Sequence, residues 1–169
     1  MTIHAAITPA PHRTTRLALW LAGVFLMAFS VLATAAEPYN TLKRGLIRDT
    51  ATGVAINGYD TVAYFTQNKP VKGSDSFTTS YEGATWKFAS KEHLALFKAD
   101  PTKYAPQYGG YCAYGVAQGY LVSIEPEQFS IIDGKLYLNY DAGVQKKWTK
   151  DPAGYNQTAT AKFSDLLKK

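Results

Sequence analysis

The sequence has very few side chains that can bind soft metals or form disulfides. Its 169 residues include one cysteine, two methionines and three histidines. A single cysteine, Cys112, excludes an intramolecular disulfide, so packing has to stabilise the fold. Three enzyme signatures are also absent: a Gly-x-Ser-x-Gly nucleophile turn, a phosphate loop ending in Gly-Lys-Ser or Gly-Lys-Thr, and a His-Glu-x-x-His zinc motif. The sequence therefore gives no direct indication of these enzyme classes.

The first thirty-six residues have the pattern of a secretory signal. Arg13 and Arg16 precede an apolar run over residues 17–32, and the small residues Ala-Thr-Ala-Ala at 33–36 follow it. As a helix this run would reach about 24 Å, short of the roughly 30 Å of a bilayer core. We therefore predict a cleaved signal at residues 1–36, with an uncleaved anchor as the alternative. The protein is expected to be periplasmic or otherwise secreted, meeting the membrane only during export.

Removal of the signal would leave a short, mildly basic chain. About 133 residues would remain, a length that suits one domain with its own core. Without Arg13 and Arg16, sixteen basic residues oppose thirteen acidic ones, so the net charge falls from +5 to near +3. Scattered lysines are typical of a solvated surface. We expect no nucleic-acid partner.

Two hairpins are predicted after an irregular leader. Residues 37–53 lack a regular pattern and predict a leader with few ties to the domain at 54–169. Alternating apolar residues around a Glu-Gly pair predict one hairpin over 77–88, and an Asp-Gly turn predicts another over 129–140.

Short helices are predicted around these hairpins, each after a residue that can cap it. Asp60 precedes residues 61–65, which suit a short helix or a strand, and Ser90 precedes a helix over 91–99. Further helices are expected after Asp141 and after Asp151-Pro152. We predict an α+β fold: a small single domain of two β-hairpins packed with short helices and a C-terminal helical segment. No internal repeat at a solenoid period is evident.

Several segments, in this order, resemble the YHS domain family. They are GYDTVAYF at residues 58–65, YEGATWKFAS at 81–90 and FKADPTKY at 97–104. The continuation PQYGGYCA at 106–113 is similar to the exported, single-domain members. The resemblance implies a small metal-binding module. Its usual cysteines are replaced here by Ala63, Ala89 and His93, and the histidine of its Tyr-His-Gly stretch by Glu82.

Few candidate ligands remain outside the signal. The other soft ligands fall within it: Met1, Met27, His4 and His12. The thiol of Cys112 and the imidazole of His93 together suit copper or zinc, and Asp60 could add an oxygen ligand. We predict a transition-metal site at these three residues. The alternatives are that Cys112 is a small buried hydrophobe, His93 a polar helix residue and Asp60 a helix cap.

Glycines and tyrosines near Cys112 indicate a pocket, because glycine permits sharp turns and tyrosine supplies walls and hydroxyls. The predicted pocket residues are Tyr59, Tyr108, Gly109, Gly110, Tyr111 and Tyr114. Two other functions therefore stay open beside metal binding: an aromatic pocket for a small ligand or a partner protein, and a thiol-dependent enzyme that uses Cys112. A homodimer is also open, and no cofactor other than a metal ion is expected.

Overall fold

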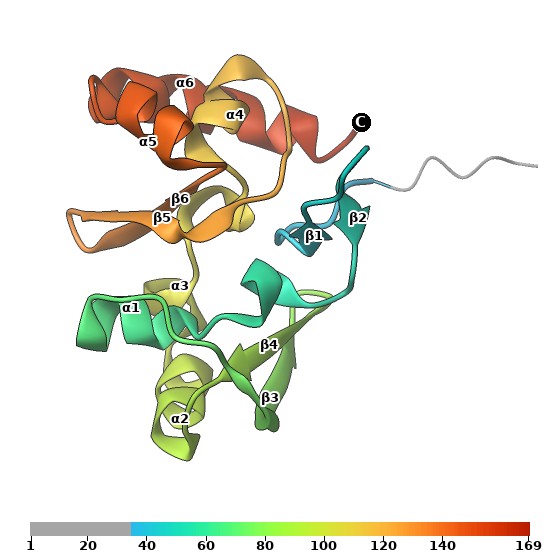
Figure 1. Ribbon diagram of the computed structural model, residues 1–169, viewed down its shortest axis with the longest axis vertical. Helices are drawn as coiled ribbons and strands as arrows, with labels where there is room; N and C mark the ends of the chain where they lie inside the picture. The colour runs from blue at the N-terminus through green and yellow to red at the C-terminus, as the bar shows by residue number, and fades with distance from the viewer. Residues whose placement is uncertain (1–34) are drawn as a thin grey trace, which may run out of the picture. The chain divides into compact units, whose positions relative to one another are not determined.

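The computed structural model describes residues 35–169, which form antiparallel hairpins and short helices (Figure 1). The strands are β1 (Leu42–Lys43), β2 (Thr50–Ala51), β3 (Ser74–Tyr81), β4 (Ala84–Phe88), β5 (Glu125–Ile132) and β6 (Lys135–Asn139). The α-helices are α1 (Thr61–Gln67), α2 (Lys91–Ala99), α3 (Pro101–Tyr104), α4 (Ala113–Gln118), α5 (Ala142–Trp148) and α6 (Pro152–Leu166). Two 3-10 turns, η1 (Ala55–Gly58) and η2 (Gln107–Gly110), complete the set. The predicted α+β class is confirmed.

The predicted signal peptide lies outside the described residues, apart from its last two positions, Ala35 and Ala36. Within residues 35–169, none of the helices has both the length and the apolar composition that crossing a bilayer requires.

Both predicted hairpins are confirmed, and each forms a two-stranded antiparallel sheet. Strands β3 and β4 are joined by Glu82 and Gly83, while β5 and β6 are joined by Asp133 and Gly134. All four turn residues have positive φ, between 48° and 82°, as a two-residue type I′ turn requires. A third pair, β1 with β2, lies in the leader.

Side chains at the predicted caps begin the helices. Asp60 accepts a hydrogen bond from the backbone N–H of Val62 at 2.9 Å, so the segment after it is a helix and the strand alternative is wrong. Ser90 accepts from His93 N at 3.1 Å at the start of α2. Asp141 and Asp151 cap α5 and α6 in the same way.

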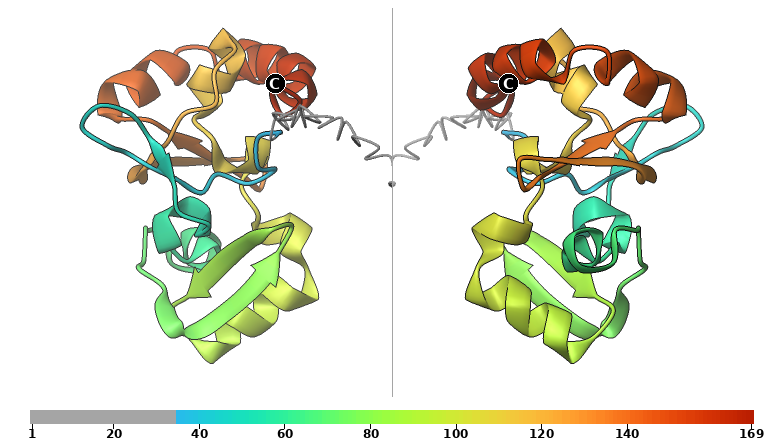
Figure 2. Two further views of the ribbon diagram at one scale, coloured as in Figure 1. Left: turned by 90° about the vertical axis from the view of Figure 1, so that its right-hand side faces the viewer. Right: turned by 90° about the vertical axis from the view of Figure 1, so that its left-hand side faces the viewer.

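One apolar core joins the two hairpins. Trp86 of β4 and Phe97 of α2 are almost fully buried, with ring centroids 4.8 Å apart. Leu136 and Leu138 of β6 belong to the same cluster of buried side chains. Tyr64 of α1 connects the halves directly, because its hydroxyl donates to Pro126 O at 3.0 Å. Figures 1 and 2 show β3, β4 and α2 in the lower part of the fold, and β5, β6, α5 and α6 in the upper part.

The leader is irregular but firmly attached, contrary to the expectation of few ties. Asn40 is 1 % exposed and its backbone N–H donates to Gly109 O at 2.8 Å, while its backbone O accepts from Ile56 N at 3.0 Å. Its side-chain amide donates to Gly110 O at 2.9 Å. The leader thus bridges the turns η1 and η2, which a local sequence pattern could not indicate because the partners lie far along the chain.

Candidate functional site

A buried carboxylate and a histidine connect α1 with α2. Asp60 is fully buried; its Oδ1 accepts from the first turn of α1, and its Oδ2 accepts from Ala89 N at 2.8 Å. The same Oδ2 lies 2.6 Å from Nδ1 of His93, whose side chain is 13 % exposed. On the other side of the ring, Nε2 is 3.4 Å from Thr66 Oγ1, which is exposed. Asp60 therefore fixes the imidazole with Nδ1 inward and Nε2 toward the surface.

Cys112 occupies a second site, at the start of α4. Its Sγ caps this helix by accepting from Gly115 N at 3.3 Å, and its S–H points toward Asn139 Oδ1 at 3.8 Å. A cavity of about 380 Å³ lies beside the thiol. We call it the Cys112 pocket, and its lining residues are Asp49, Cys112, Tyr114, Gly115, Gln118, Tyr120, Val122, Tyr140 and Val144. Three tyrosines and two valines make its walls mostly apolar.

The environment of Cys112 favours the neutral thiol. Burial raises the pKa of the thiol above its ordinary value, and the backbone N–H groups of Gly115, Tyr140 and Tyr114 oppose that effect only in part. The negative charge of Asp141 also raises the pKa. Because the thiolate is the nucleophilic form, this shift makes Cys112 less nucleophilic near neutral pH than an ordinary thiol.

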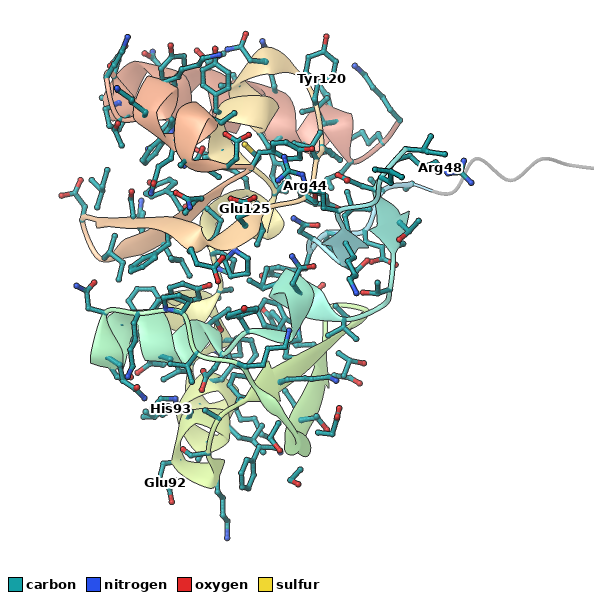
Figure 3. All side chains as sticks on the ribbon, in the orientation of Figure 1. Arg44, Arg48, Glu92, His93, Tyr120 and Glu125 are labelled. Atoms are coloured by element: carbon teal, nitrogen blue, oxygen red, sulfur yellow. The ribbon has the colours of Figure 1, made fainter. Side chains whose placement is uncertain are left out.

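The three predicted metal ligands do not form one site. The structure brings Asp60 and His93 together but gives Cys112 other neighbours. Figure 3 shows His93 in the lower part of the fold, whereas Tyr120, at the Cys112 pocket, lies near its upper end. Among residues 35–169, no group of three or more histidine, cysteine, aspartate or glutamate side chains is placed to hold a metal ion.

The predicted pocket residues are also dispersed. Tyr114 lines the Cys112 pocket, whereas Tyr59 lines a different, basic pocket. Tyr108 and Tyr111 lie in neither, since their hydroxyls donate to Asn156 O and Glu37 O and fix η2 to α6 and to the leader. Gly109 and Gly110 lie in neither because the leader and η1 pack closely against them. A Cβ on Gly109 would lie 2.0 Å from Pro38 O, and one on Gly110 would lie 2.2 Å from Ile56 Cδ1.

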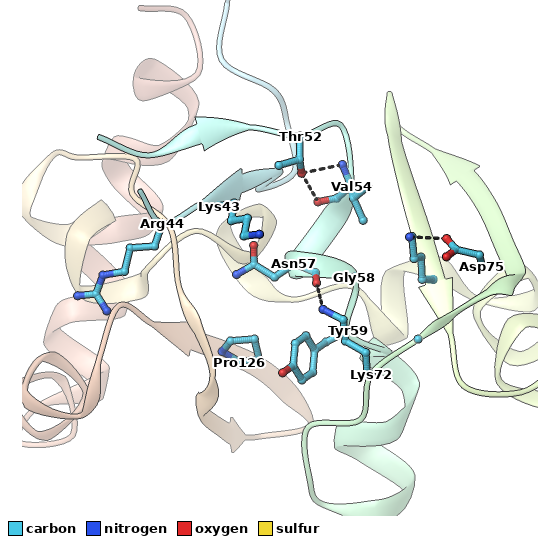
Figure 4. A pocket seen from close by; sticks show the side chains of 12 residues that line it. Lys43, Arg44, Thr52, Val54, Asn57, Gly58, Tyr59, Lys72, Asp75 and Pro126 are labelled. Atoms are coloured by element: carbon cyan, nitrogen blue, oxygen red, sulfur yellow. Dashed lines mark hydrogen bonds and ion pairs between the residues drawn. The ribbon is translucent and has the colours of Figure 1, made fainter. Parts of the chain in front are cut away.

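The basic pocket has a volume of about 480 Å³ and lies between the leader, η1 and β4 (Figure 4). Its cationic lining residues are Lys43, Arg44, Lys72 and Lys87, with Asp75 as the one acidic residue. Lys87 pairs with Asp75 at 2.5 Å, whereas Lys72 donates to Asn57 O at 2.6 Å and lies 4.5 Å from the ring centre of Tyr59. Burial, and the nearby charges of Lys87 and Lys43, lower the pKa of Lys72. An anion bound in the pocket would reduce the repulsion between Lys72 and these neighbouring lysines.

Residues 62–108 match the family model of the YHS domain. This segment of the chain is similar to the YHS domain. The match covers less than half of the sequence, from the start of α1 into η2. His93 therefore falls inside the matched segment, Asp60 lies just before it, and Cys112 lies after it. No curated protein and no solved structure matches the chain.

Most of the Cys112 pocket was not predicted from the sequence. Gln118 and Tyr120 come from the end of α4 and the loop after it, Tyr140 from the turn between β6 and α5, Val144 from the first turn of α5, and Asp49 from the leader. The glycines and tyrosines near Cys112 gave the signal, and of the predicted pocket residues Tyr114 alone lines this pocket. Val144 and Val122 carry no such signal, because an isolated valine has no pattern that distinguishes a pocket wall from a core position.

Proposed function

We propose that the chain is a binding module that holds a small, mostly apolar molecule in the Cys112 pocket. The observation that supports this proposal is a cavity of about 380 Å³ walled by Tyr114, Tyr120 and Tyr140. Small-molecule sites commonly have volumes of roughly 300 to 1,000 Å³ and apolar, aromatic walls. Tyr120 is 65 % exposed at this pocket, so a bound ligand would cover an aromatic surface that otherwise faces water.

The polar groups of the pocket limit the class of ligand. One carboxylate oxygen of Asp49 is engaged, because its Oδ2 accepts from Ser123 N at 2.8 Å. Burial raises the pKa of the Cys112 thiol and so favours its neutral form, and Gln118 and the tyrosine hydroxyls add hydrogen-bonding capacity. These features suit an uncharged molecule of one or two rings that makes one or two hydrogen bonds.

Titration with an uncharged aromatic dye, N-phenyl-1-naphthylamine, tests the proposal through the rise in dye fluorescence. We expect saturable binding of one equivalent, and Tyr120→Ala should weaken it about five- to tenfold, since a stacked aromatic contact contributes roughly 1 kcal/mol or more. Leu96→Ala is the matched control, because Leu96 is also an exposed apolar side chain, on α2. Equal affinity in all three proteins would reject this pocket as the site.

Metal binding, which the YHS resemblance implies, is the first alternative. It is supported by the matched domain, by the one free cysteine and by the Asp60–His93 pair. A site for copper or zinc would have to use fewer than three protein ligands from the described residues, or ligands from a second chain. Elemental analysis after dialysis against copper or zinc, with Cys112→Ser and His93→Gln compared with the unchanged chain, tests this alternative. Equal uptake by the three proteins would exclude both residues as ligands.

We also propose that the protein acts outside the cytoplasm, because residues 13–36 have the pattern of a secretory signal. Binding to a partner protein or to a second copy of the chain is a further alternative, which light scattering tests. The thiol-enzyme alternative receives less support, because burial favours the neutral thiol.

Anion binding is a second candidate function, at the basic pocket. The supporting observation is that Lys43, Lys72 and Lys87 line one cavity, whose lining includes a single carboxylate, that of Asp75. Inorganic phosphate should therefore raise the melting temperature, and Lys72→Met should remove much of this increment. Lys69→Met, in the exposed loop before β3, is the control. An increment that is the same in both variants would point to general salt effects and reject the site.

A further inference from the structure

The described chain contains the same order of elements twice. In the first series, η1 is followed by α1, the hairpin β3–β4, α2 and α3. In the second, η2 is followed by α4, the hairpin β5–β6, α5 and α6. We call these the first repeat (residues 55–104) and the second repeat (residues 107–155), which ends in the first turn of the longer helix α6. Figure 1 shows the first repeat in the lower part of the fold and most of the second in the upper part.

The strand register is identical in the two hairpins. Ser74 pairs with Phe88 and Thr78 with Lys87 in the first repeat, and the register shifts between these pairs. The second repeat has the same shift, between Glu125 paired with Asn139 and Phe129 paired with Leu138. Every strand residue of the second hairpin thus has the number of its counterpart plus 51. Bulges are specific features of a fold, so agreement in position and size is strong evidence for equivalence.

An unusual backbone turn also recurs. Three consecutive residues of η1, beginning at Ile56, have φ of 51°, 53° and 73°, and three of η2, beginning at Tyr108, have φ of 54°, 60° and 78°. Positive φ is uncommon for residues other than glycine and costly for a β-branched one such as Ile56. In both turns the residue after the third donates its N–H back to the first residue, at 3.0 Å. Equivalent residues of the two turns differ by 52 in number, whereas those of the hairpins differ by 51. The difference arises because α1, between turn and hairpin, is one residue longer than α4.

The caps of the helices correspond as well. Ser90 and Asp141 each accept from the backbone N–H three residues later, which belongs to His93 in one repeat and Val144 in the other. Asp100 and Asp151 each precede a proline and cap the next helix. At the start of α1 and of α4 the capping side chains are those of Asp60 and Cys112.

We propose that the two repeats are copies of one structural unit, and that the Asp60–His93 pair and the Cys112 pocket are the same site in two forms. Cys112 takes the place of Asp60, and Val144 takes the place of His93. In the first repeat the carboxylate and the imidazole meet at 2.6 Å. In the second, both Cys112 and Val144 line an open cavity. The residues at these two equivalent positions therefore decide whether the site holds a hydrogen-bonded pair or an open cavity.

This equivalence predicts what a histidine at position 144 would do. In Val144→His the new imidazole would approach Cys112 Sγ as His93 approaches Asp60. A histidine beside a thiol favours the thiolate, whose formation controls reaction with iodoacetamide. The other titratable groups around the thiol, Asp49, Asp141, Tyr114, Tyr120 and Tyr140, are unchanged in this variant.

The experiment measures the rate of Cys112 alkylation by iodoacetamide against pH in the full chain. We expect Val144→His to shift the midpoint of the profile downward by at least about one pH unit, a roughly tenfold faster reaction at pH 7. Lys146→His is the matched control, because residue 146 lies on the same helix and is exposed. A general loosening of the fold would expose the thiol and lower the midpoint as well, so the melting temperatures of the two variants are compared alongside the pH profiles. Identical midpoints in the two variants would overturn the equivalence.

A second variant covers the case in which Val144→His does not fold. Cys112→Asp combined with Val144→His would rebuild the pair of the first repeat, so the double variant should melt several degrees above Cys112→Asp alone. A double variant that melts at or below the single one overturns the proposal. Neither readout involves a bound ligand. Failure of dye binding would therefore reject the proposed function and leave the equivalence of the two sites intact.

Discussion

Asp60 uses both of its carboxylate oxygens inside the fold. Oδ1 accepts from the N–H groups of Val62 and Ala63, and Oδ2 accepts from Ala89 N and contacts His93. Loss of the carboxylate would leave several buried donors without partners, whereas loss of the imidazole would remove only one of these contacts. Asp60 is therefore primarily a structural residue, and it orients His93.

These contacts predict unequal effects on stability. Asp60→Ala should lower the free energy of unfolding by about 3 kcal/mol, because unpaired buried donors cost about 1 to 3 kcal/mol each and effects overlap. His93→Ala should cost about 1 kcal/mol. Urea unfolding followed by circular dichroism measures both. Asp75→Ala is the control, since Asp75 is an exposed carboxylate paired with Lys87 and should change stability by less than about 1 kcal/mol. Equal losses at residues 60 and 93 would contradict this assignment.

Among the elements, the turn η2 has the closest backbone contact with the leader. Gly109 has a φ of +60°, and a Cβ there would lie 2.0 Å from Pro38 O. Two separate requirements therefore select glycine at this position: the left-handed backbone and the contact with the leader. Gly53 has a similar φ of +72°, but nothing lies within 4 Å of its Cβ position.

Comparing alanine substitutions at Gly53 and Gly109 separates the two requirements experimentally. Gly53→Ala should cost about 1 kcal/mol, the strain of a left-handed backbone alone. Gly109→Ala should cost at least about 2 kcal/mol more, because the backbone of the leader has to move away. Urea unfolding gives both values. Similar losses in the two variants would mean that the leader does not pack against η2 in solution.

At the scale of the whole domain, side chains of the two repeats meet in one buried cluster. Ile56, Trp86 and Phe97 of the first repeat and Leu136 and Leu138 of the second belong to one buried cluster. Separating the repeats would therefore expose part of this cluster to water. We therefore expect the halves to unfold together.

Two tryptophans report separately on the halves, Trp86 in the first repeat and Trp148 in the second, and both are almost fully buried. With Trp20 and one of these two replaced by phenylalanine, the fluorescence midpoint in urea should coincide with the circular dichroism midpoint of the same variant. We expect this agreement for both reporters. A fluorescence transition that precedes the circular dichroism transition in either variant would show that the halves unfold independently.

Local sequence signals by themselves determined the hairpins, most of the helix starts and the YHS resemblance. Ser90, Asp141 and the Asp-Gly turn at 133–134 act through neighbours within four residues, so their effects are visible in the sequence. The contact of Asp60 with His93, 33 positions away, and the separation of both from Cys112 depended on how the elements pack.

Only the tertiary structure decided that the domain repeats itself. The two halves share few residue types at equivalent positions, and they place different chemistry at the same point, Asp60 with His93 in one and Cys112 with Val144 in the other. Backbone register, caps and left-handed turns preserve the unit, because these depend on geometry that many sequences satisfy. The sequence therefore determined the elements, whereas the tertiary structure determined that one site is closed by a hydrogen-bonded pair and the other is open.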